Sequence, residues 1–185
     1  MTKSSATENG LHEATITLLN HGGSVWGDLW HIYMDNKGGW YGDFGGAIQV
    51  ASDYFKTIRV HGDGLDVVVM GIDETALSNM EFFRKHNYGN AKVGIFFVSA
   101  RSESQRDVTA ENLIAAGYDQ GWEGLILRQS HEDALTNKDF KSLHRAELER
   151  KGYRILFNIG DQWSDLEGPP ENRGFKLSNP MYYRY

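Results

Sequence analysis

Polar and charged side chains follow several of the apolar runs of this sequence. One more lies in a helix-like stretch that precedes the last apolar run. They are Asp73, Thr75, Ser99, Arg101, Lys141, Asp161 and Asp165. Carboxylates combined with a hydroxyl, an Arg and a Lys are suited to binding a divalent cation and a phosphate-like anion. Taken singly, each Asp or Ser is better explained as a helix cap. Their coincidence therefore favours a site only if the fold brings them together.

The elements that would position these side chains alternate along the chain. Four apolar, β-branched runs predict buried strands at residues 67–72, 93–98, 124–127 and 154–159. Helix-like stretches lie between them, at 76–86, 104–116 and 138–151. This alternation predicts an α/β fold with a mainly parallel sheet covered on both faces, a three-layer α/β/α sandwich. Ligands bind such sheets beyond the carboxyl ends of the strands, so the candidate residues should share one rim.

The region before the first strand is predicted to be packaging around this core. Residues 1–11 are polar and predict a disordered tail. Residues 12–65 predict a helical, aromatic-rich segment, with helices at 24–35 and 47–60. A chain of 185 residues is close to the size of one ordinary domain, so residues 12–185 are expected to form a single one, with its core at 66–185.

Composition excludes several classes of function. The formal net charge of -6 gives no basic surface for nucleic acid, and no apolar run approaches the roughly 20 residues of a membrane span. The absence of Cys rules out disulfides and thiolate chemistry. The first ten residues lack the apolar core of a secretory signal. We therefore expect a soluble protein, cytoplasmic as the sequence stands, or a mature secreted or vacuolar form whose signal was removed.

Three stretches around the candidate residues resemble plant acid phosphatases and vegetative storage proteins of the haloacid dehalogenase (HAD)-like superfamily. They are IDET at 72–75, FFVSARSE at 96–103 and GDQWSDL at 160–166. The resemblance continues to FKL at 175–177 and NPMYY at 179–183, and covers the chain from about residue 66. It implies a HAD-like, Rossmann-type form of the α/β sandwich.

The resemblance also implies roles for individual residues. In this family the first motif reads D-x-D-x-T, where the first Asp attacks phosphorus and the second acts as general acid and base. Asp73 resembles the acid/base, Ser99 the phosphate donor and Lys141 the cation that neutralises the phosphate. Asp161 resembles the Mg²⁺ ligand, with Asp165 supporting it.

The position of the nucleophile is occupied by Gly71, which has no side chain to attack with. The same replacement removes one metal ligand, so we expect Mg²⁺ to be the only cofactor and to bind weakly at what remains of its site. The remaining candidate metal ligands are Asp73, Asp161 and Asp165. The candidate anion-binding residues are Ser99, Arg101 and Lys141.

A second departure from the family concerns the cap, a module inserted between the first motif and the second strand. Here residues 90–92 lead directly into the strand at 93, so the cap domain is predicted to be deleted. Residues 76–88 must then form the crossover between the first two strands, which needs about a dozen residues.

Three functions are compatible with these observations. The first is a storage-like or anion-binding protein without ordinary phosphatase activity, because a covalent nucleophile is hard to replace. The second is a repurposed lyase, isomerase or cyclase that uses Asp73 as acid or base without a covalent intermediate. The third is a weak, Mg²⁺-dependent phosphomonoesterase. The expected partner is a small-molecule or anionic ligand rather than nucleic acid or membrane, and a homo-oligomer is left open.

Overall fold

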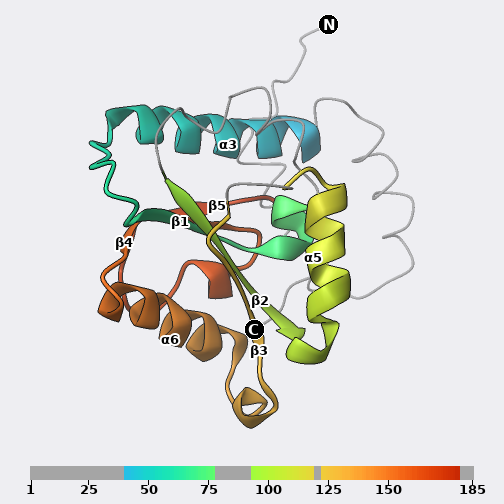
Figure 1. Ribbon diagram of the computed structural model, residues 1–185. Helices are drawn as coiled ribbons and strands as arrows, with labels where there is room; N and C mark the ends of the chain where they lie inside the picture. Colours follow the sequence, from blue (N-terminus) through green and yellow to red (C-terminus); the bar gives the residue numbers. More distant parts are fainter. Residues whose placement is uncertain (1–39, 78–92, 119–121, 180–185) are drawn as a thin grey trace, which may run out of the picture. The chain divides into compact units, whose positions relative to one another are not determined.

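Figure 1 shows the computed structural model of the chain, which describes residues 40–77, 93–118 and 122–179. Contacts divide the chain into two units, Met1–Asp43 and Phe44–Tyr185, and the sheet and site belong to the second. The predicted tail, the helix at 24–35, most of the helix at 76–86 and the capless connection lie outside the described residues. The domain boundaries therefore stay predictions.

The centre of the second unit is a five-stranded sheet in which every pair of neighbours is parallel. Its order is β3-β2-β1-β4-β5. β1, in the middle, is buried along its whole length, as its run of β-branched residues predicts. The α/β fold with a parallel sheet is confirmed. The strands are β1 (Asp66–Met70), β2 (Gly94–Ser102), β3 (Gly124–Arg128), β4 (Arg154–Gly160) and β5 (Gly174–Lys176).

Three strands differ from the prediction. β1 ends at Met70, two residues before the predicted end at 72, because the chain enters the turn at Ile72–Ala76 there. β2 continues to Ser102, because this residue still pairs with Arg128 of β3 beyond an irregularity that starts at Ser99. Ser99 and Arg101 consequently lie within the end of a strand rather than after it. The sequence does not predict β5, whose three residues include one buried side chain, Phe175, and are too short to show a period.

One face of the sheet is covered by α6 (Asn137–Arg150), as Figure 1 shows. Phe140 and Leu148 of this helix form a buried cluster with apolar side chains of β1 and β2, among them Val67 and Val69. The predicted helix at 138–151 is therefore confirmed to within one residue at each end. Burial of these side chains fixes the height of α6 over the sheet, and with it the position of Lys141.

The opposite face carries α5 (Arg106–Ala115) and the part of α3 (Trp40–Thr57) that belongs to the second unit. Tyr54 of α3 makes an edge-to-face contact with Phe157 of β4, with ring centroids 6.3 Å apart. Tyr118, just after α5, does the same with Phe97 of β2 at 5.1 Å. None of the helices within residues 40–77, 93–118 and 122–179 has the length and apolar character of a membrane span.

α3 begins seven residues before the predicted helix at 47–60. A glycine pair at 45–46 explains the difference, because Gly in a helix interior costs about 1 kcal/mol relative to Ala and argues against a helix there. The structure carries the helix through both glycines. The predicted apolar face is confirmed at Ile48 and Ala51, which are both buried.

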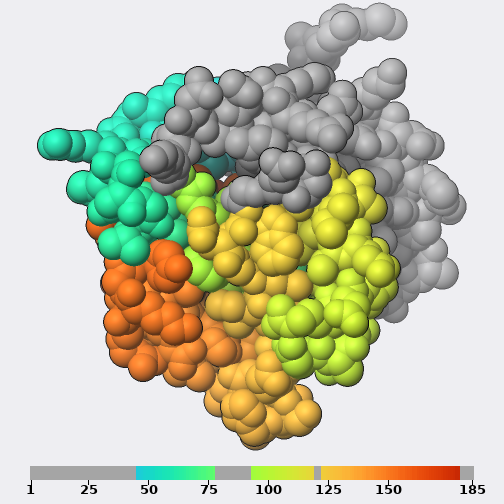
Figure 2. Space-filling model, in the orientation of Figure 1, coloured from blue at the N-terminus to red at the C-terminus, as the bar shows by residue number. Residues whose placement is uncertain are grey.

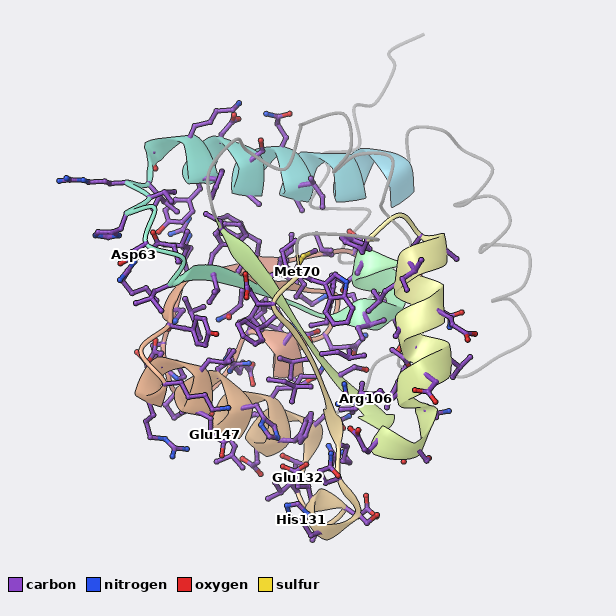
Figure 3. All side chains as sticks on the ribbon, in the orientation of Figure 1. Asp63, Met70, Arg106, His131, Glu132 and Glu147 are labelled. Carbon is purple, nitrogen blue, oxygen red and sulfur yellow. The ribbon has the colours of Figure 1, made fainter. Side chains whose placement is uncertain are left out.

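At the amino ends of the strands, Asp66 joins β1 to β4. Its fully buried carboxylate accepts hydrogen bonds from Arg154 Nε at 2.7 Å and from the backbone N–H of His61 at 2.6 Å. The Arg154 guanidinium holds the pKa of Asp66 at about 2. Figure 3 labels Asp63, which precedes this end of β1, and Met70 at the other end. Asp66 therefore lies at the end of β1 opposite to Gly71 and contributes no carboxylate there.

Candidate functional site

The candidate residues gather at the carboxyl edge of β1, β2 and β4, which we call the rim. Short helical turns follow two of these strands, η1 (Ile72–Ala76) after β1 and η4 (Trp163–Asp165) after β4. The backbone N–H of Gly71 donates to the carbonyl of Ile159 at 3.0 Å and so holds the two turns together. The predicted site residues that meet here are Gly71, Asp73, Ser99, Arg101, Lys141, Asp161 and Asp165.

Gly71 itself has an ordinary extended backbone, with φ of -66° and ψ of 167°. Any residue adopts these angles, so the conformation does not require glycine. A Cβ added at this position would lie 3.1 Å from Thr75 Oγ1 and 3.2 Å from Asp165 Oδ1. Two polar groups therefore border the space that a side chain at position 71 would enter.

Asp73 forms an ion pair with Arg101 through both of its carboxylate oxygens. Arg101 Nε donates to Oδ2 at 3.1 Å, and Nη2 donates to Oδ1. The third corner of the guanidinium, Nη1, donates to Thr109 Oγ1 of α5 at 3.2 Å. The next residue along the chain, Glu74, has a positive φ of 49°, in the left-handed region that costs a non-glycine residue about 1–2 kcal/mol.

Lys141 and Asp165 form a second, more deeply buried ion pair. Lys141 Nζ donates to Asp165 Oδ1 at 2.5 Å, and their side chains are 10% and 4% exposed. Burial raises the pKa of Asp165, against the lowering effect of the Lys141 ammonium. Gly160 makes room for this carboxylate, because a Cβ there would overlap Asp165 Cβ and Cγ. The sequence does not indicate this role of Gly160, because the contact with Asp165 depends on the shape of the turn between the two residues.

Asp161 is surrounded by hydrogen-bond donors. Thr75 Oγ1 donates to its Oδ1 at 3.0 Å, while Gln162 Nε2 and Asn179 Nδ2 each donate to its Oδ2 at 2.6 Å. Sequence reasoning did not assign Asn179 or Gln162 to the site. Both lie in motifs that carry the family resemblance, and that resemblance is the signal by which the sequence could have assigned them to the site.

Lys176, at the end of β5, is a further cation that sequence reasoning missed. Burial lowers the pKa of its ammonium, while the negative charges of Asp161 and Asp165 raise it. Its Nζ donates to the carbonyl of Leu177 at 2.7 Å and lies 5.8 Å from the centre of the Trp163 ring. Because the sequence does not predict β5, it does not indicate that Lys176 lies at the rim.

The three carboxylates at the rim are each held by protein hydrogen-bond donors, and two of them are in ion pairs. Each of the six oxygens of Asp73, Asp161 and Asp165 already accepts a hydrogen bond from a protein donor. Mg²⁺ requires a set of oxygen ligands arranged around it in near-octahedral geometry. In the part of the chain that the structure describes, no group of three or more His, Asp or Glu side chains is arranged to hold a metal ion.

A second polar cluster joins the turn η3 (Ser130–Glu132) to α6. His144 of α6 is 2.7 Å from the buried Glu132 through Nε2 and 3.0 Å from Glu147 through Nδ1. Although burial alone would raise the pKa of Glu132, hydrogen bonds from the Gln129 amide and His144 lower it overall. Figure 3 labels Glu132 and Glu147, and Figure 2 shows this turn and α6 side by side on one face. The cluster ties two elements together and lies outside the rim.

A parallel sheet with a serine, three cations and three aspartates at its carboxyl edge is consistent with a protein of the HAD type. A family model described as HAD superfamily, subfamily IIIB (Acid phosphatase), matches residues 28–94 and 91–185. The chain belongs to this family. The match is made in two pieces that meet at residues 91–94, next to the segment where the sequence predicts the deletion of the cap.

Known plant proteins are similar over most of the chain. Acid phosphatase 1 of Solanum lycopersicum is 37% identical over 166 residues, covering 72% of this chain and 65% of the relative. The Stem 31 kDa glycoprotein of Glycine max is 36% identical over 169 residues, with coverages of 73% and 65%. Vegetative storage protein 1 of Arabidopsis thaliana is 32% identical over 163 residues, with coverages of 70% and 60%. The chain thus spans less than two thirds of each relative.

Proposed function

We propose that this protein is an anion-binding, storage-like member of the acid phosphatase family that lacks the family's covalent route to phosphomonoester hydrolysis. The observation that carries the proposal is Gly71 at the end of β1, with Thr75 and Asp165 beside the empty side-chain position. Relatives of both kinds, an acid phosphatase and a vegetative storage protein, are compatible with it.

Hydrolysis is the step that this rim is poorly equipped to perform. An attacking carboxylate at position 71 would form an aspartyl-phosphate, and glycine offers no atom that can attack. Removal of a covalent nucleophile can lower kcat by a factor on the order of 10⁶. Among the described residues, Asp73 is the nearest carboxylate in sequence, and Arg101 occupies both of its oxygens.

Anion binding needs donors and positive charge, and the rim keeps both. Arg101 supplies a guanidinium that solvent can reach, Ser99 supplies a hydroxyl, and Lys141 supplies a second positive charge that is buried in its pair with Asp165. Ser99 Oγ accepts a hydrogen bond from the backbone N–H of Arg101 at 3.3 Å, which leaves its hydroxyl hydrogen to donate to a ligand. A small phosphate-like anion is the ligand that such donors suit best.

The two other functions receive less support. In a repurposed lyase, isomerase or cyclase, Asp73 must transfer a proton, yet its ion pair with Arg101 has to open first. In a residual phosphatase, a metal-bound water must attack, yet a metal ion would have to compete with Arg101 for Asp73 and with Lys141 for Asp165. We therefore also infer that Mg²⁺ binds weakly to the wild type.

Two measurements on one preparation test the proposal. Hydrolysis of an aryl phosphate, assayed with and without Mg²⁺, is expected to stay at the buffer background, because the rim holds an anion with nothing positioned to attack it. Titration calorimetry with orthophosphate is expected to show binding. Turnover that Asp73→Asn abolishes would instead favour attack by water, and a non-hydrolytic conversion lost in the same variant would favour the repurposed enzyme.

A further inference from the structure

The guanidinium of Arg101 is fixed in place and presents its fork to the rim. Thr109 Oγ1, which accepts from Nη1 at 3.2 Å, belongs to a fully buried side chain of α5 and anchors one corner. The other two nitrogens, Nε and Nη2, point at Asp73. Arg101 is thus oriented by α5 independently of the group that its fork holds.

A bidentate guanidinium fork binds carboxylate and phosphate oxygens with the same geometry. Asp73 therefore occupies the position that two oxygens of a phosphate would take. This pair can be reached from solvent, because the side chain of Arg101 is 22% exposed and that of Asp73 is 43% exposed. The Lys141–Asp165 pair is 10% and 4% exposed and offers no comparable access.

We propose that Asp73 is an internal occupant of the anion site, which an incoming phosphate or phosphomonoester must displace from Arg101. The inference rests on the proposed anion-binding function, and it adds a side chain that competes with the anion and so lowers the affinity of the site. Displacement frees the turn that contains Asp73, in which Glu74 holds a left-handed backbone with φ of 49°. Arg101 then bonds to the anion, while the Ser99 hydroxyl beside it donates to a further oxygen.

An internal occupant weakens binding by a predictable rule. The apparent dissociation constant equals the intrinsic one divided by the fraction of molecules whose site is open. Removing the negative charge of Asp73 raises that fraction and should tighten phosphate binding. This expectation is opposite to the usual one, in which removing a side chain from a binding site weakens it.

The test is titration calorimetry of the full chain with inorganic phosphate in the presence of a metal chelator. We expect Asp73→Asn to bind about fivefold more tightly than the wild type, which corresponds to about 1 kcal/mol. Asp133→Asn, which removes an exposed carboxylate from another turn, controls for net charge and should bind like the wild type. Arg101→Gln should lose phosphate binding. Arg101→Lys, which keeps the charge without the fork, should weaken binding at least tenfold. Circular dichroism checks that each variant is folded.

The possible outcomes separate this inference from the proposed function. If the wild type binds phosphate and Asp73→Asn binds equally or more weakly, Asp73 is no competitor and the inference is overturned, while anion binding stands. If Asp73→Asn and Asp133→Asn tighten binding equally, the effect is one of net charge and the inference also falls. If neither the wild type nor Asp73→Asn binds phosphate, the proposed function itself is wrong.

Discussion

At the scale of single residues, two glycines of the rim differ in what they allow. Gly71 has extended backbone angles, and a Cβ there would meet its nearest neighbours at 3.1 and 3.2 Å, a tight contact that a small shift relieves. At Gly160 an added Cβ would overlap the Asp165 side chain. The present fold thus requires glycine at 160 but not at 71. Glycine at 71 changes the chemistry of the rim more than its shape.

Gly160→Ala should consequently destabilise the protein by about 2–4 kcal/mol, because its methyl group would displace Asp165 from its buried pair with Lys141. Urea unfolding followed by circular dichroism measures this. The matched control is Gly45→Ala in α3, where an added Cβ meets nothing within 4 Å and the helix should gain about 0.5–1 kcal/mol. A Gly160→Ala variant as stable as the wild type would show that Asp165 is not held against this glycine.

At the scale of elements, Asp66 stabilises the junction of β1 and β4 through charge. Its pKa is lowered from 3.8 to about 2, chiefly by the hydrogen bond from Arg154. A carboxyl group whose folded pKa is depressed stabilises the fold above its unfolded pKa, and this contribution is lost as the pH falls through the folded pKa. The window of loss therefore runs from about 3.8 down to about 2.

We expect Asp66→Asn to lower the free energy of unfolding by about 1–2 kcal/mol at neutral pH, a figure reduced for the partial exposure of Arg154. The difference from the wild type should shrink as the pH is lowered through that window, as measured by urea unfolding at a series of pH values. Asp63→Asn is the control, because Asp63 pairs with the same Arg154 but is largely exposed. Equal losses in both variants would refute a special role for the buried carboxylate.

The sequence predicts elements well where their apolar pattern is long, and poorly where it is short. α6 and the four longer strands follow from apolar patterns in the sequence, such as the run Val67–Met70, whereas β5 contributes one buried Phe175 and leaves no periodic trace. The candidate site residues were found through their motifs. Their pairing was not, because Asp73 and Arg101 are separated by 28 residues and only the folded sheet brings them together.

At the scale of the whole molecule, the rim is electrically balanced by its own side chains. Three carboxylates, Asp73, Asp161 and Asp165, lie with three cations, Arg101, Lys141 and Lys176. A fourth carboxylate at position 71 would leave an excess negative charge, which a divalent cation could offset. With Gly71 the rim has no such excess charge, which agrees with the weak binding of Mg²⁺ that we propose.

Gly71→Asp should restore that need. The new carboxylate, crowded against Asp165 Oδ1, should lower stability by about 1–3 kcal/mol without metal, which lowers Tm by roughly 2–12 °C for a chain of this size. Mg²⁺ should then raise Tm of this variant, because a ligand that binds the folded state stabilises it, while leaving the wild type nearly unchanged. Gly71→Asn, which has the same shape without the charge, should be destabilised by crowding and not rescued by Mg²⁺. Differential scanning calorimetry with and without Mg²⁺ measures these changes in Tm. An equal rise of Tm in the wild type and Gly71→Asp would mean that the native rim already binds the ion.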